Sequence, residues 1–209
     1  ERQDRPMTAL LPAELAWYVT GRFYCANDGT LADYGYFLYL PAFGAPLFDG
    51  TPGETTAHFT FAAKPFDAGS LDNGALSLAL DPVGEFSVYL QRRPAGNFDD
   101  PSSFAVGERI ASFRRTSLVV GTTVDAASGA SAQPLIGTNV FSARLIASTP
   151  FEFGGRRHDL AHSIGLGVTQ FGTAATTPVD PPPKGFNLVL PFTGSAIALK
   201  SGAMVGNES

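Results

Sequence analysis

The sequence predicts an all-β domain in the form of a closed antiparallel β-barrel of about eight to ten strands. Apolar and polar residues alternate along many short segments, which is the pattern of half-buried strands. Turn-forming residues such as Asn27-Asp28-Gly29 separate these segments, and no long helical pattern interrupts them. A two-sheet jelly-roll sandwich is the alternative, because both architectures bury one face of every strand.

The composition favours one domain with a large interior. The 209 residues fit a single β domain, with residues 1–12 and 201–209 expected as loose ends. Only 16% of the residues are charged, below the roughly 25% of typical soluble domains, and 17 residues are Phe. A chain with few charges and many aromatic residues has much internal surface to line.

The first two strands are expected to form an antiparallel hairpin around the turn at residues 27–29. Strict alternation marks the first strand, residues 17–25. One of its faces carries Trp17, Val19, Gly21, Phe23 and Cys25, and the other carries Tyr18, Thr20, Arg22 and Tyr24. The second strand covers residues 31–40 and includes Tyr34 and Tyr36.

The same alternation predicts the remaining strands, which follow one another at near-regular spacing. They are expected over residues 57–63, 76–80, 86–90, 109–113, 116–124, 139–147, 164–171 and 186–199. The Arg114-Arg115 pair between two of these runs indicates a bulge where one long strand bends. Strands joined by short turns form a meander, and closure of the meander removes its exposed edges, which favours the barrel.

The predicted architecture resembles the lipocalins and other calycins, which are ligand-binding barrels. The resemblance is one of architecture, since Trp17 follows Leu15 and Ala16 and the Gly-x-Trp signature of lipocalins is missing. It implies a binding module for a small, largely apolar molecule, although a shared fold does not fix function.

The residues expected to bind this ligand are aromatic or weakly polar and lie on strands or in one loop. They are Tyr18, Tyr24, Tyr34, Tyr36, His58, Phe43 and Phe48. Tyrosines on strands give a cavity apolar area with a polar tip. The Phe-bearing segment at residues 41–54 is expected to act as a lid over the cavity.

Two further functions stay open at the level of sequence. A cofactor-free barrel enzyme of the isomerase or cyclase type needs one or two polar groups in its pocket, for which His58, Tyr24 and Tyr36 are the candidates. A structural or interaction domain with a filled core needs no pocket. Whether the protein is an enzyme is therefore left undecided by the sequence.

Residues 156–162 contain a short motif that resembles a zinc site. His158 and His162 share one face if the segment is helical, and Asp159 stands where zincins carry Glu. In an extended segment the two histidines would lie about 13 Å apart, too far for one metal ion. No metal or other cofactor is expected, and these three residues are the candidates if one binds.

Charge, cysteine content and hydropathy narrow the choice of partners. A net charge of −5 argues against nucleic acid, and no apolar run is long enough for a membrane span. Neighbouring residues on a strand face opposite ways, so one guanidinium of each of the three Arg-Arg pairs would face inward, towards an anionic ligand, if the pair is not in a turn. The favoured interpretation is that the pairs lie at strand ends and keep the protein in solution. The lone Cys25 forms no internal disulfide, and the start at Glu1 indicates that any signal peptide has been removed. Compartment and oligomeric state stay open.

Overall fold

The computed structural model confirms the all-β fold class. It describes residues 14–40, 43, 45–63, 69–73, 76–81, 84–117, 119–125 and 134–199. The loose ends predicted at residues 1–12 and 201–209 lie outside the described residues. In the described part of the chain, one sheet of eleven antiparallel strands is accompanied by a separate two-stranded hairpin.

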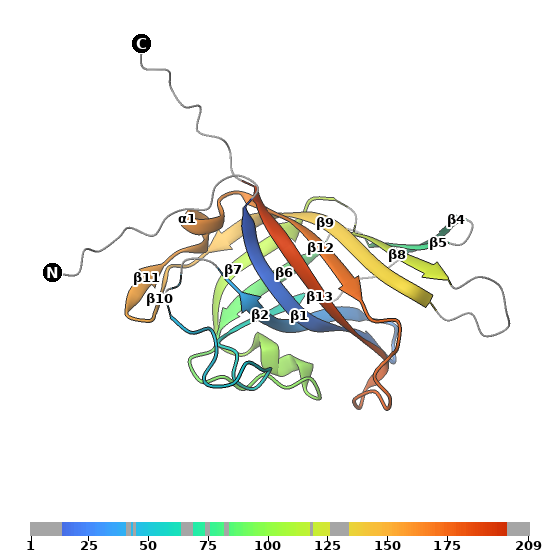
Figure 1. The fold of residues 1–209 in the computed structure, drawn as a ribbon, viewed down its shortest axis with the longest axis horizontal. Coiled ribbons are helices and arrows are strands. Elements are labelled where there is room, and N and C mark those ends of the chain that lie inside the picture. The colour runs from blue at the N-terminus through green and yellow to red at the C-terminus, as the bar shows by residue number, and fades with distance from the viewer. Residues whose placement is uncertain are drawn as a thin grey trace, which may run out of the picture.

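Eight strands of the large sheet close into a barrel, as Figure 1 shows. In barrel order they are β1 (Leu15–Ala26), β2 (Leu31–Tyr39), β3 (Phe59–Ala63), β6 (Glu85–Leu90), β7 (Glu108–Arg115), β9 (Pro134–Ser148), β12 (Gly167–Ala174) and β13 (Phe186–Leu199). Closure occurs because β12 pairs with β13 on one side and with β9 on the other, while β13 pairs with β1. The predicted barrel is therefore confirmed over the sandwich.

The rest of the large sheet extends away from the barrel (Figure 1). β4 (Gly69–Asn73), β5 (Leu76–Asp81) and β8 (Val119–Asp125) pair in sequence and join the first half of β9. Arg115 pairs with Ala143 and Val120 pairs with Val140, so the β7–β8 chain carries two more residues than β9 over this stretch. This irregularity follows directly on Arg115, where the sequence indicated a bulge.

One end of the barrel is covered by elements that the sequence did not predict. The connection from β9 to β12 forms the hairpin of β10 (Phe151–Phe153) and β11 (Arg156–His158) and then the short helix α1 (Leu160–Ile164). Asp159 caps α1, because its side chain accepts a hydrogen bond from the Ala161 amide. The strand expected from residue 164 therefore begins only at Gly167.

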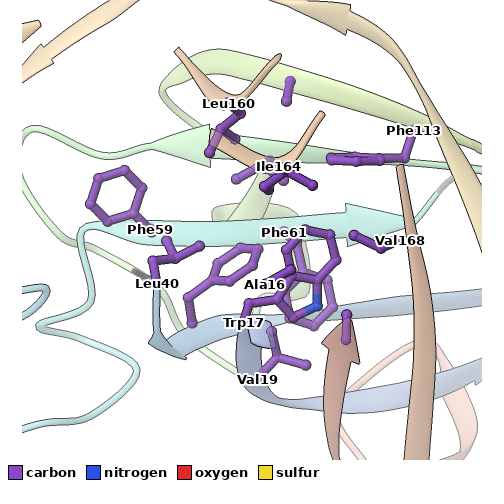
Figure 2. Close-up of a cluster of buried hydrophobic side chains, with 14 of the residues drawn as sticks. Ala16, Trp17, Val19, Leu40, Phe59, Phe61, Phe113, Leu160, Ile164 and Val168 are labelled. Atoms are coloured by element: carbon purple, nitrogen blue, oxygen red, sulfur yellow. The ribbon is translucent and has the colours of Figure 1, made fainter. Parts of the chain in front are cut away.

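The interior below this cap is packed with aromatic rings, and we call it the packed half. Trp17 is 1% exposed and its ring lies 5.6 Å from that of Phe37 and 5.4 Å from that of Phe113. Figure 2 shows Leu160 and Ile164 of α1 in the same buried cluster as Trp17 and Phe113. The helix thus closes the end of the barrel with its apolar side chains.

Two glycines let β1 and β2 pass close to the packed rings. Gly21 and Gly35 pair with each other, and both face the barrel interior. A Cβ atom at Gly35 would collide with the backbone oxygen of Thr20 and lie 2.8 Å from the Phe61 ring. Only a residue without a side chain fits between the strand and this ring.

Candidate functional site

The other half of the barrel interior is less completely covered, and we call it the accessible half. Phe23 and Phe192 pack against the core but are only half-buried, although both face inward. Leu190 is paired with Phe23 across the β1–β13 ladder, and it too is half-buried. Apolar side chains that face the interior and still meet solvent are typical of the lining of a binding pocket.

A charged pair lies among these apolar side chains. Asp33 on β2 is paired with Phe23, so its side chain shares the inward face. Arg115 on β7 is the second residue after Phe113, which also points inward. The guanidinium approaches the Asp33 carboxylate to 3.4 Å, with side-chain exposures of 3% for Arg115 and 22% for Asp33. Arginine and aspartate thus meet across the interior, the aspartate on the more solvated side.

Aromatic and amide groups complete the surroundings of this pair. The Arg115 guanidinium carbon lies 5.0 Å from the centre of the Phe141 ring, a cation–π contact. Gln170 on β12 is paired with Phe141, and its side-chain oxygen accepts a hydrogen bond from the Trp17 indole at 3.2 Å. The Asn139 side chain lies over Gly172, where a Cβ atom would be 2.6 Å from its Oδ1. Four strands therefore contribute a polar group to the interior.

The predicted tyrosine face points outward, where a loop covers it. Tyr24 is fully buried under residues 91–107, and its hydroxyl donates a hydrogen bond to the Phe98 carbonyl at 2.8 Å. The ring centre of Tyr34 lies 5.7 Å from that of Tyr24, and the ring centre of Tyr36 lies 6.1 Å from those of Phe48 and Phe98. The structure brings these predicted residues together, but on the outside of the barrel and away from Asp33 and Arg115.

Burial changes the acidity of these tyrosines. Desolvation raises the pKa of Tyr24 strongly, and it also raises the pKa values of Tyr34 and Tyr36. The three hydroxyls therefore stay protonated to higher pH than an ordinary tyrosine, and in this form they can donate hydrogen bonds.

The remaining predicted ligand residues are dispersed. Tyr18 is exposed on the outer face, whereas Phe43 is buried in the packed half and stacks on Phe59 with ring centres 4.9 Å apart. His58 lies just before β3, where its Nδ1 donates to the Gln91 carbonyl at 2.9 Å and its ring contacts Phe153. Of the predicted lid segment, Phe43 thus lies in the packed half, whereas Phe48 lies on the outer tyrosine face.

The zinc-like motif is divided between three local environments. His158 is buried, and its Nε2 donates to the Phe153 carbonyl at 3.0 Å. The Asp159 carboxylate caps α1 and accepts a hydrogen bond from the Ser148 hydroxyl, while His162 is exposed on the helix. Among the described residues, no three His, Cys, Asp or Glu side chains are grouped so that they could hold a metal ion.

The arginine pairs behave differently from one another. Arg114 is exposed on the outer face and pairs with Glu85 at 2.9 Å, so the second pair splits between the two faces, as the alternation predicted. The other two pairs, Arg92-Arg93 and Arg156-Arg157, are exposed throughout.

A separate depression of about 300 Å³ lies at the connection between β6 and β7. Its lining includes Gln91, Arg92, Val106 and Glu108, and it shares no residue with the accessible half. An exposed ion pair between Arg92 and Glu108, 3.0 Å long, crosses it. The depression and the barrel interior are therefore different candidate sites. The interior is the better candidate, because its ion pair is more buried than the exposed pair in the depression.

Comparisons with protein families, curated proteins and solved structures gave no match for this chain. In the ranges that the structure describes, no helix is long and apolar enough to cross a membrane.

Three polar residues of the interior were not predicted from the sequence, namely Asp33, Asn139 and Gln170. All three occupy alternating positions of strands whose apolar members face inward, and this alternation was the available signal. Asp33 shares the inward face of β2 with Gly35 and Phe37. Tyr34 and Tyr36, which were predicted to bind the ligand, lie on the opposite face.

Proposed function

We propose that this protein binds a small, largely apolar molecule in the accessible half of the barrel. The observation that supports the proposal is that Phe23, Leu190 and Phe192 face inward and remain half-buried. A ligand placed against them would remove this apolar surface from water, which is the main source of binding free energy for such molecules.

The proposal also explains why the barrel interior carries polar groups. Small-molecule pockets are mostly apolar and use a few polar groups to orient the ligand. Asp33 supplies such a group beside Phe23, while Arg115 lies beside Asp33 and Gln170 beside Trp17. A purely structural barrel would gain more stability from apolar residues at these positions.

A neutral fluorescent dye tests the proposal. The naphthalene ketone 6-propionyl-2-(dimethylamino)naphthalene brightens and shifts to the blue when it leaves water. We expect saturable binding to the protein, and we expect Leu190→Arg to weaken it by about tenfold or more, because the new side chain occupies the site.

Phe171→Arg is the matched control, since Phe171 is 48% exposed and lies on the outer face of β12. It should leave the affinity for the dye unchanged. Circular dichroism checks that both variants fold, and Leu188→Arg replaces Leu190→Arg if the latter does not. Equal affinity of the two variants, or no saturable binding by the wild-type protein, would overturn the proposal.

A cofactor-free enzyme is the second candidate function. The Asp33 carboxylate favours it, because a partly solvated carboxylate that faces the barrel interior is a candidate general base. His58, Tyr24 and Tyr36 lie outside the interior, so Asp33 would take the role first expected of them. Conversion of a bound molecule by the wild-type protein, lost in Asp33→Asn, would favour the enzyme over the binding module.

A further inference from the structure

The charge of the barrel interior is balanced within the protein itself. Asp33 and Arg115 carry opposite charges and lie 3.4 Å apart. The other charged residues on the described barrel strands lie on the outer face or, in the case of Glu108, at the β6–β7 connection, where it pairs with the exposed Arg92. Those on the outer face are Arg22, Glu85, Arg109, Arg114 and Arg144. The interior therefore presents a neutral pair, whose arginine is buried and whose aspartate is partly solvated.

This balance decides which ligand group the site can accept. A carboxylate that entered beside Arg115 would lose its hydration and would lie close to the like charge of Asp33. A carbonyl group loses much less hydration, and it accepts a charge-assisted hydrogen bond from a guanidinium without adding charge. A neutral acceptor is thus favoured over an anion.

Gln170 strengthens this preference for an acceptor. Its side-chain oxygen is used by the Trp17 indole, so the group it can offer a ligand is its amide nitrogen, which is a donor. Gln170 is paired with Phe141, and the Arg115 guanidinium lies over that same ring. Two donor groups therefore flank one aromatic side chain in the interior.

From this arrangement we infer that the ligand is a neutral molecule with an apolar body and a carbonyl oxygen, such as a ketone, ester or amide, an inference that rests on the function proposed above. The carbonyl oxygen accepts hydrogen bonds from Arg115 and Gln170. Asp33 determines the selectivity of the site, because its negative charge repels carboxylates.

Two dyes with the same ring system test the inference, namely 6-(dimethylamino)-2-naphthamide and 6-(dimethylamino)-2-naphthoate. At pH 8 the naphthoate is an anion and the naphthamide is neutral. We expect the wild-type protein to bind the naphthamide about tenfold more tightly than the naphthoate.

Asp33→Asn removes the carboxylate that lies 3.4 Å from Arg115, so we expect it to tighten naphthoate binding by about tenfold and to change naphthamide binding by less than about threefold. Glu85→Gln is the matched control, because it removes a carboxylate from the Arg114 ion pair on the outer face. It should leave both affinities unchanged. If Asp33→Asn fails to fold, Asp33→Ser serves in its place.

The outcomes separate this inference from the function on which it rests. Equal or tighter binding of the naphthoate by the wild-type protein, or an unchanged ratio in the Asp33 variant, would overturn the inference and leave the binding function standing. Binding of neither dye by any variant would overturn both.

Discussion

The two halves of the barrel face the same interior but differ in how completely their side chains are covered. In the packed half, Trp17 is 1% exposed and Phe113 is fully buried. In the accessible half, Phe23 and Leu190 point inward and remain half-buried. The strands alone do not produce this difference, because α1 and the β10–β11 hairpin cover only one end. Stability is thus concentrated in one half, and the other half is the one in which we propose that a ligand binds.

The largest change in the free energy of unfolding is expected from truncating a side chain in the packed half. Phe113→Ala removes a ring that stacks on Phe86 at 4.9 Å, so it should lower the free energy of unfolding by about 3–5 kcal/mol. Phe23→Ala, the same truncation in the accessible half, should cost only about 1–2 kcal/mol, since part of that ring is already in water. Urea denaturation followed by circular dichroism measures both changes. Equal costs would show that the halves do not differ in packing.

A smaller loss of stability is expected from breaking the inner ion pair, Asp33–Arg115, and a still smaller one from breaking the outer pair, Glu85–Arg114. Asp33→Asn leaves a guanidinium that is 3% exposed beside a neutral amide, so it should lower the free energy of unfolding by about 2 kcal/mol. Glu85→Gln acts on the exposed Arg114 pair and should cost less than about 1 kcal/mol. Urea denaturation again provides the measurement. A larger cost for the outer variant would contradict the assignment of Arg115 to the interior.

The smallest effect concerns the tyrosines outside the barrel. Tyr24→Phe removes the hydrogen bond to the Phe98 carbonyl and should lower the free energy of unfolding by about 1 kcal/mol near neutral pH. Burial raises the pKa of Tyr24 in the folded protein. Above pH 10.0 the hydroxyl is therefore ionised in most unfolded chains while it is still protonated in the folded protein. The wild-type protein therefore loses stability there through Tyr24, and the difference from Tyr24→Phe should narrow.

Denaturation midpoints measured at intervals from about pH 8 to pH 11 check this trend. The tyrosines shared by both proteins cancel in the comparison. A stability difference that grows above pH 10.0 would mean that Tyr24 is not buried as a neutral hydroxyl.

The sequence predicted the strands well because alternation is a local signal. The hairpin of β1 and β2 and the irregularity after Arg115 follow from residue pattern and turn chemistry. The closed barrel was preferred to a sandwich because closure removes exposed sheet edges. The β10–β11 hairpin was missed, because strands of three residues are too short to show a period. Helix α1 was missed for the same reason, since it has five residues.

The site was harder to predict because alternation does not say which face is inside. Tyr24 and Tyr34 form a semi-polar face that resembles a pocket lining, yet residues 91–107 cover it from outside. The ladder between β1 and β2 also shifts at Tyr18 and Val19, which interrupts the alternation of β2 near its end. Asp33 and Arg115 meet only through the closure of the barrel, which brings together residues 82 positions apart.

The most direct measurement is a crystal structure of the protein with a bromine-substituted 6-(dimethylamino)-2-naphthamide. The anomalous signal of bromine locates the ligand without reference to the protein. We predict one peak inside the barrel beside Phe23 and Phe192, with the amide oxygen at hydrogen-bond distance from Arg115. A peak on the outer tyrosine face or in the depression between β6 and β7, with none in the interior, would contradict the proposed site.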